Sequence, residues 1–143
     1  ILSRNRFGFQ EQKIIPQNFA GELPAIKVYE DDKTLAFMDI MPQADGHTLV
    51  IPKESAETLF DLSPESAAHT IQIVQKIGVA IKKALNTEGI VLMQLNDKTA
   101  GQTVPHIHFH LVPTSLQQLG KHASQMGDQD KIKTIAEKIK AAL

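Results

Sequence analysis

Three of the six histidines in this chain stand at alternate positions: His106, His108 and His110. A β-strand sends alternate side chains to one face, so a strand over residues 104–113 would hold all three imidazoles on the same side. Ile107 and Phe109 lie between them and would face the core. A register slip of one residue would bury the histidines, which makes the register firm. The sequence therefore predicts a row of imidazoles on one face of a strand.

Such a row suits two kinds of chemistry. A neutral imidazole can attack phosphorus while a neighbouring ring donates a proton, because a pKa near 6.5 permits both forms. Histidines at i and i+2 on a strand, with a third, also suit zinc. Gly101, Gln102 and Thr103 directly precede the strand and favour phosphate, since they offer a close backbone approach and hydrogen-bond donors. A three-histidine metal site remains the alternative.

Composition narrows the class of protein. The chain has 143 residues, 42% of them hydrophobic, with 15 basic against 16 acidic side chains, which indicates one globular domain without a basic field for nucleic acid. It has no cysteine, so disulfides, thiolate metal sites and cysteine nucleophiles are excluded. No apolar run approaches the ~18–20 residues of a membrane span, and the first residues lack a signal-peptide pattern. We expect a cytoplasmic protein with no membrane or nucleic-acid partner.

The pattern along the chain predicts an α+β fold. Five strands are expected, at residues 25–30, 34–40, 47–52, 90–96 and 104–113. A long helix should begin after Ser63, with a proline at its first position, and end near Asn86; a C-terminal helix should follow Asp128 or Asp130. We expect a five-stranded antiparallel meander, with the long helix between strands three and four. One domain spans residues 1–143, with an arm at 1–24, a core at 25–113 and an extension at 114–143.

The long helix carries two overlapping apolar stripes, whereas a helix packed on one side needs only one. One stripe includes Ile71 and Val74, and the other includes Ile73 and Ile77. A second protomer covering one stripe and deep burial of the whole helix are both consistent with this pattern.

The histidine segment, His106-Ile107-His108-Phe109-His110-Leu111-Val112, resembles the His-φ-His-φ-His-φ-φ motif of the histidine triad (HIT) family. The run LAFMDIMPQADGHTLVIPK at 35–53 and the run from residue 96 to 113 resemble the family's two conserved blocks. The likeness covers roughly residues 24–113 and looks closest to the small bacterial members of the HINT-like branch. It implies the HIT-like fold, a homodimer, and a hydrolase or transferase acting at the α-phosphate of purine nucleotide phosphoramidates or phosphoanhydrides.

The resemblance also implies roles for single residues. His108 would be the nucleophile and carry a nucleotidyl intermediate, with its other ring nitrogen donating to the carbonyl of His106. His110 would contact the phosphate and the leaving group, and His47 would support the triad. Asp39 would accept the ribose hydroxyls. The expected phosphate-side positions are Asn96, Gly101, Gln102 and Thr103, and the expected purine slot is Phe37, Ile40 and Leu49.

Departures from the family pattern bear on metals. Many members bind structural zinc through two N-terminal cysteines and a later histidine, but this chain has no cysteine and has Ser55 and Ala56 where that histidine would stand. We therefore expect no cofactor and no metal. The phosphate charge should be met by an imidazolium and by oriented donors. Two other functions stay open: a purine-nucleotide-binding interaction protein without catalysis, and a metal enzyme using the three histidines.

Overall fold

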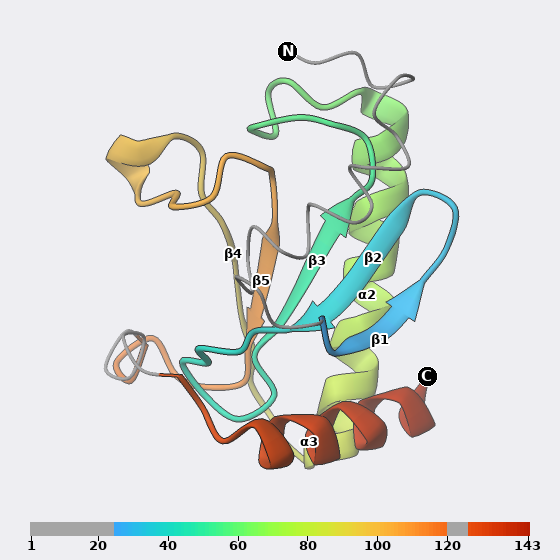
Figure 1. Cartoon of the computed structure of the whole chain (residues 1–143), viewed down its shortest axis with the longest axis vertical. Coiled ribbons are helices and arrows are strands. Elements are labelled where there is room, and N and C mark those ends of the chain that lie inside the picture. Colours follow the sequence, from blue (N-terminus) through green and yellow to red (C-terminus); the bar gives the residue numbers. More distant parts are fainter. Residues whose placement is uncertain (1–24, 120–125) are drawn as a thin grey trace.

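The computed structural model describes residues 25–119 and 126–143, so the expected arm at 1–24 lies outside the described residues. Along the chain, three strands are followed by a long helix, two further strands and a C-terminal helix (Figure 1). They are β1 (Lys27–Glu30), β2 (Thr34–Met38), β3 (Thr48–Pro52), α2 (Pro64–Leu85), β4 (Val91–Gln94), a short 3-10 helix (Lys98–Ala100), β5 (Phe109–Val112) and α3 (Gln129–Ala142).

The five strands form one sheet in the order β1-β2-β3-β5-β4, and each neighbouring pair is antiparallel. The expected α+β class, the antiparallel sheet and the positions of both helices are confirmed. The strand order differs from a simple meander at its last step. After α2 the chain forms β4 at the edge of the sheet rather than beside β3. Strand β5 then fills the position between β3 and β4. The histidine strand is therefore an interior strand.

Helix α2 has the ends that its sequence predicts. The Ser63 side chain accepts a hydrogen bond from the backbone N–H of Ser66, Pro64 occupies the first turn, and Asn86 ends the helix in the left-handed conformation. Its inner face, which includes Ile73 and Ile77, packs into the main core. The other stripe is only partly covered, since Val74 is buried in the main core and Ile71 is exposed. Val79, which lines the same groove as Ile71, is exposed too.

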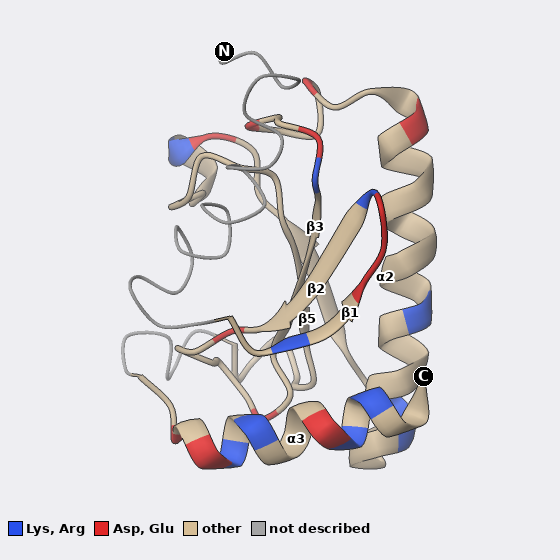
Figure 2. Ribbon diagram, turned by 45° about the vertical axis from the view of Figure 1, so that its right-hand side comes forward, with Lys and Arg blue, Asp and Glu red and all other residues tan. Residues whose placement is uncertain are grey.

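Helix α3 begins at Asp128, whose carboxylate accepts from the backbone N–H groups of Asp130 and Lys131. It packs against α2 and β1 and runs across one end of α2 (Figure 1). Acidic and basic residues are interspersed along α3 (Figure 2). Among the described residues, no helix combines the length and apolarity that crossing a bilayer requires.

The two faces of the sheet differ in what covers them. Side chains on the α2 face, such as Val50 and Phe109, belong to the main core. A second, smaller apolar cluster occupies the opposite face and consists of Leu35, Phe37, Leu49 and Ile51. Leu49 is directly paired with His110, so His110 emerges on this second face, away from α2.

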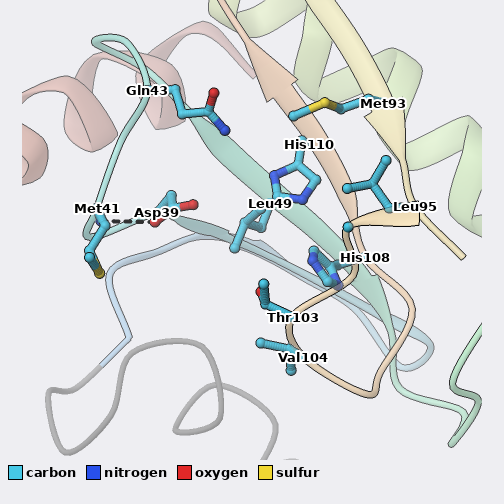
Figure 3. Close-up of a pocket in the computed structure, with 11 residues that line it drawn as sticks. Asp39, Met41, Gln43, Leu49, Met93, Leu95, Thr103, Val104, His108 and His110 are labelled. Atoms are coloured by element: carbon cyan, nitrogen blue, oxygen red, sulfur yellow. Dashed lines mark hydrogen bonds between the residues drawn. The ribbon is translucent and has the colours of Figure 1, made fainter. Parts of the chain in front are cut away.

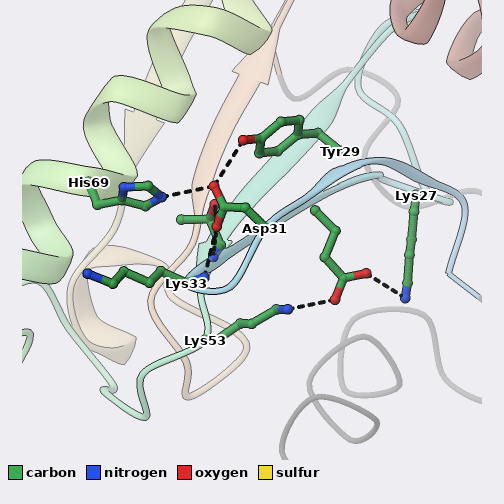
Figure 4. A network of polar contacts seen from close by, with 8 residues as sticks. Lys27, Tyr29, Asp31, Lys33, Lys53 and His69 are labelled. Carbon is green, nitrogen blue, oxygen red and sulfur yellow. Dashed lines mark hydrogen bonds and ion pairs between the residues drawn. The ribbon is translucent and has the colours of Figure 1, made fainter.

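A cluster of polar side chains connects the β1–β2 turn to α2 through hydrogen bonds (Figure 4). We call it the hairpin cluster: Tyr29, Asp31, Thr34 and His69. The Asp31 carboxylate accepts from the Tyr29 hydroxyl at 3.0 Å, from His69 Nε2 at 2.9 Å, and from the Thr34 amide and hydroxyl at 2.8 Å each. Helix and hairpin are thus joined through one carboxylate.

Candidate active site

The histidine segment keeps its predicted alternation although its regular strand is shorter than expected. Strand β5 begins only at Phe109, so His106 and His108 lie in the irregular approach to it. Ile107 and Phe109 are nonetheless buried in the main core. The rings of His108 and His110 lie on the other face, with centroids 4.7 Å apart. Pairing with β3 and β4 begins at Phe109, so the segment before it is held by its buried apolar side chains and by a hydrogen bond from the Ile107 amide to the Ala56 carbonyl at 2.9 Å.

Hydrogen bonds to backbone carbonyls orient two of the rings. His108 Nδ1 donates to the carbonyl oxygen of His106 at 2.7 Å, the contact that the family resemblance implied. The proton of the neutral ring therefore sits on Nδ1, and the lone pair lies on Nε2. His106 Nε2 donates in turn to the carbonyl of Pro52 at 2.8 Å, which directs that ring into the β3 backbone.

The tautomers of His47 and His110 follow from a backbone amide. The N–H of Gln43 donates to His47 Nδ1 at 3.1 Å, which leaves the His47 proton on Nε2. His47 Nε2 lies 3.0 Å from His110 Nδ1, so it donates to that atom. His110 must then carry its own proton on Nε2, on the opposite side of its ring. Gln43 thus determines, through His47, that His110 is a hydrogen-bond donor.

Asp39 stands beside this pair. One carboxylate oxygen accepts from the amide of Met41 at 2.8 Å, and the other lies 3.5 Å from His47 Nε2. Burial raises the pKa of Asp39 to about 6, and the Met41 hydrogen bond offsets only part of that effect.

Burial also sets the charge state of the histidines. Desolvation, with a smaller contribution from the neighbouring His108, lowers the pKa of His47 to about 4. Desolvation and the neighbouring His108 and His47 lower the pKa of His110 to about 3. Desolvation lowers the pKa of His106 and His108 as well. All four rings are neutral at pH 7, so the expected imidazolium is not supported, and oriented N–H groups are the donors.

These groups open into a cavity of about 450 Å³ (Figure 3). His108 and His110 lie side by side in its lining, and Asp39 lies across from them. The remaining lining is mainly apolar. The full lining is Asp39, Met41, Gln43, Leu49, Met93, Leu95, Gly101, Thr103, Val104, His108 and His110.

The structure brings six of the predicted site residues into this lining: Asp39, Leu49, Gly101, Thr103, His108 and His110. Gly101 has a φ of +110°, a left-handed conformation that favours glycine. His47 lies behind His110, and His106 is turned toward Pro52. Phe37 and Ile40 are buried and do not line the cavity.

Asn96 and Gln102 do not point into the cavity, contrary to their expected phosphate-side positions. The Gln102 amide donates to the carbonyls of Glu57 and Val104, at 2.7 and 2.9 Å, and its oxygen accepts from the Asp97 amide. The Asn96 oxygen accepts from the Leu59 amide at 2.9 Å. Both side chains hold loops together because buried backbone groups in irregular segments need partners.

Sequence reasoning missed five lining residues: Met41, Gln43, Met93, Leu95 and Val104. Met93 pairs directly with His110 across the sheet, and Leu95 follows two residues later on the same side. That neighbourhood appears only when β4 is placed beside β5. Apolar residues near the triad carried no pattern that distinguished lining from core.

The three histidines of the motif are not a set whose ligand atoms converge in the part of the chain that the structure describes. The three-histidine metal site is therefore not supported. A different set does converge within the described residues. Asp39, His47 and His110 each offer one ligand atom, and these atoms lie within 4.8 Å of one another.

Comparison with known proteins agrees with this fold and site. The model of the HIT domain matches residues 20–117. The chain is 40% identical to adenosine 5'-monophosphoramidase hnt1 of Schizosaccharomyces pombe over 100 residues, which cover 70% of this chain and 72% of that protein. It is also 40% identical to Protein hit of Bacillus subtilis, over 72% of this chain and 71% of that one.

Solved structures show the same architecture. A Hit-like protein from Bartonella henselae, described as involved in cell-cycle regulation, is 43% identical and superimposes with a TM-score of 0.78, covering 91% of this chain and 95% of that one. A zinc-bound histidine triad family protein from Mycobacterium smegmatis is 35% identical, with a TM-score of 0.73 over 90% of this chain and 91% of that one. Motif, sheet order and family match agree, and this chain belongs to the HIT domain family.

Proposed function

We propose that this protein is a nucleotide hydrolase or transferase that acts at the α-phosphate of purine nucleotide phosphoramidates or phosphoanhydrides. The observation that carries the proposal is the hydrogen bond from His108 Nδ1 to the His106 carbonyl. It makes Nε2 the basic nitrogen of a neutral ring that lines the cavity. A ring that is neutral at pH 7 needs no general base to become a nucleophile.

The chemistry proceeds as two displacements. His108 Nε2 forms a bond to the α-phosphorus while the bond from phosphorus to the leaving nitrogen or oxygen breaks, and the leaving group takes a proton from solvent water. A water molecule then attacks phosphorus and the phosphorus–Nε2 bond breaks. The proton lost by that water passes to the solvent, which returns His108 to its neutral form and releases the nucleoside monophosphate. His110 and Thr103 line the cavity with His108, and the His110 Nε2–H and the Thr103 hydroxyl would donate to the phosphate oxygens.

The rest of the cavity suits a nucleoside. Asp39 lies across from the histidines and, as a carboxylate, accepts the hydrogen bonds of a ribose diol. Leu49, Met41 and Leu95 provide apolar surface for a purine ring. Two relatives support the reaction class, since those of Schizosaccharomyces pombe and Candida albicans are named adenosine 5'-monophosphoramidases.

Mass spectrometry of the protein mixed with a slowly turned-over adenosine phosphoramidate tests the proposal. We expect a nucleotidyl adduct on His108 that is absent from His108→Ala, whose turnover falls by at least about 10³-fold. His69→Gln is the matched control, because His69 lies in the hairpin cluster. Tight binding of adenosine monophosphate without adduct or turnover would favour the binding protein instead.

The proposal includes a homodimer. Ile71 and Val79 on α2 and Leu92 on β4 are exposed, and they border a groove of about 450 Å³. Strand β4 is an edge of the sheet, so a two-fold partner would cover both its free backbone groups and this groove. Sedimentation velocity is expected to give a dimer for the wild type and a monomer for Val79→Asp. A monomeric wild type would contradict it.

A further inference from the structure

We propose that Asp39, His47 and His110 form a site for a divalent transition-metal ion, with Zn²⁺ as the preferred occupant, and that this ion and the nucleotide exclude each other. The mutual exclusion depends on the proposed nucleotide site, whereas metal binding does not. The set differs from the three histidines of the sequence motif, because it takes one residue from each of three separate segments.

Two of the three distances between the ligand atoms are close to those of tetrahedral zinc. Zinc–nitrogen and zinc–oxygen bonds of about 2.0–2.2 Å place neighbouring ligands roughly 3.3–3.5 Å apart. His47 Nε2 lies 3.0 Å from His110 Nδ1 and 3.5 Å from the Asp39 oxygen. The Asp39 oxygen and the His110 nitrogen lie within 4.8 Å of each other, so binding would draw these two side chains together by as much as about an ångström. An ion would replace the proton that now lies between the two rings. Two imidazoles, one carboxylate and a water would complete four ligands.

Two cavities give the cluster access and room for that fourth ligand. Asp39 and His110 line the nucleotide cavity, and Asp39 and His47 line a second one, of about 180 Å³, near α3. The chain has no cysteine that would compete for a soft metal. The ligand set carries one negative charge, so it neutralises half of a divalent ion.

Metal binding has a structural consequence at Gln43. His47 can ligate through Nε2 only if its proton moves to Nδ1, the atom that accepts the Gln43 amide hydrogen bond. That bond must break. We therefore expect the amide resonance of Gln43 to shift when zinc binds, which a zinc ion on the protein surface elsewhere would not cause.

Exclusion follows from shared atoms. The Asp39 carboxylate that would accept the ribose hydroxyls would be bound to the metal. The metal would also hold the His110 ring by Nδ1, the atom that now accepts from His47. By linkage, the nucleotide must weaken zinc binding by the same factor as zinc weakens nucleotide binding.

Calorimetric titration of the full chain with zinc chloride at pH 7 tests the site. We expect one ion per chain, and affinity about 100-fold weaker or less in Asp39→Asn and His47→Gln. His69→Gln is the control, since His69 also pairs with an aspartate, at 2.9 Å, but lies on the surface of α2. Thermal unfolding checks that each variant is folded, and the Gln43 amide in wild-type protein gives a readout that needs no variant.

Each outcome decides the matter. Zinc affinity lost in His69→Gln but kept in Asp39→Asn, or an unshifted Gln43 amide at saturating zinc, would overturn the metal site. Adenosine monophosphate is then added to the zinc-loaded chain, with a tenfold or larger weakening of zinc binding expected. Simultaneous binding of both overturns the exclusion alone. If adenosine monophosphate does not bind even without zinc, the nucleotide site fails while the metal site stands on the first titration.

Discussion

Two aspartates in this protein each stand beside a histidine, yet their surroundings shift their pKa values in opposite directions. Partial burial acts on Asp31 and raises its pKa, but hydrogen bonds from the Lys33 amide, His69, Thr34 and Tyr29 outweigh it and hold the pKa well below its usual range. Asp39 is desolvated with one amide donor, and its pKa rises to about 6. The two carboxylates differ both in how strongly burial desolvates them and in the number of donors directed at the charge.

This contrast separates a stabilising carboxylate from one held ready for a ligand. Asp31 uses its bonding capacity within the protein and joins a hairpin to α2 (Figure 4). Within the described residues, the second oxygen of Asp39 lies 3.5 Å from His47 Nε2, and Asp39 lines a cavity. Asp39 therefore keeps bonding capacity for the ligand that we propose.

The largest expected effect is on activity. Asp39→Asn should lower kcat/KM for an adenosine phosphoramidate by about 100-fold, because the proposed charged hydrogen bonds to the ribose would be lost. Asp31→Asn should change it by no more than about twofold. Steady-state kinetics of both variants provides the comparison, and equal losses would show that the two carboxylates do not differ in role.

The same pair should show opposite effects on stability at pH 7. Asp31→Asn is expected to lower the free energy of unfolding by about 2 kcal/mol, because the hydrogen-bond donors around Asp31 would lose their negatively charged acceptor. Asp39→Asn should raise it by about 2 kcal/mol, because ionising a buried carboxyl whose folded pKa is about 6 is unfavourable at this pH. Urea denaturation measures both, and a loss of stability in Asp39→Asn would contradict the assignment.

The histidines of the cavity predict acid sensitivity. The pKa of His47 is 6.5 when unperturbed and about 4 in the fold. The neutral ring therefore contributes fully to the free energy of unfolding above pH 6.5, and this contribution is lost as the pH falls toward 4. That loss is about 2 kcal/mol at pH 5, and His110 acts in the same direction. Asp39 has a raised pKa and acts oppositely, gaining about 1 kcal/mol between pH 7 and 5.

With about 2 kcal/mol lost at each of His47 and His110 and about 1 kcal/mol regained at Asp39, the free energy of unfolding of the wild type should be about 3 kcal/mol lower at pH 5 than at pH 7. His47→Gln should show a smaller difference because its side chain does not titrate. Denaturation curves at pH 7, 6 and 5 measure both. A wild type with the same stability across that range would show that these rings are not desolvated.

How far the sequence predicts this arrangement depends on the kind of contact involved. Alternation identified the faces of the histidine segment and the α2 caps identified its ends, because both patterns are local. The place of β5 between β3 and β4 is a tertiary choice with no local pattern. Met93 was missed for that reason, since it reaches His110 only through that pairing.

The site residues divide in the same way. Asp39, His108 and His110 lie where the family motif implied, around one cavity. Gln102 occupies the position that the family motif implied, but its side chain points away from the cavity. It donates to the carbonyls of Glu57 and Val104, which require donors once they are buried. Gln43 acts through its backbone amide, which its side-chain identity does not reveal.

The smallest expected effect concerns the histidine of the hairpin cluster. His69 and Asp31 form a pair at 2.9 Å, with side chains that are 34% and 24% exposed, so solvent screens the interaction. His69→Gln should lower the free energy of unfolding by only about 0.5 kcal/mol, because the Asp31 carboxylate keeps its donors from Tyr29 and Thr34. Urea denaturation at low and high salt measures it. A loss as large as that of Asp31→Asn would mean that the pair, rather than the set of donors, stabilises the hairpin, and the contrast with Asp39 would then rest on one charge pair.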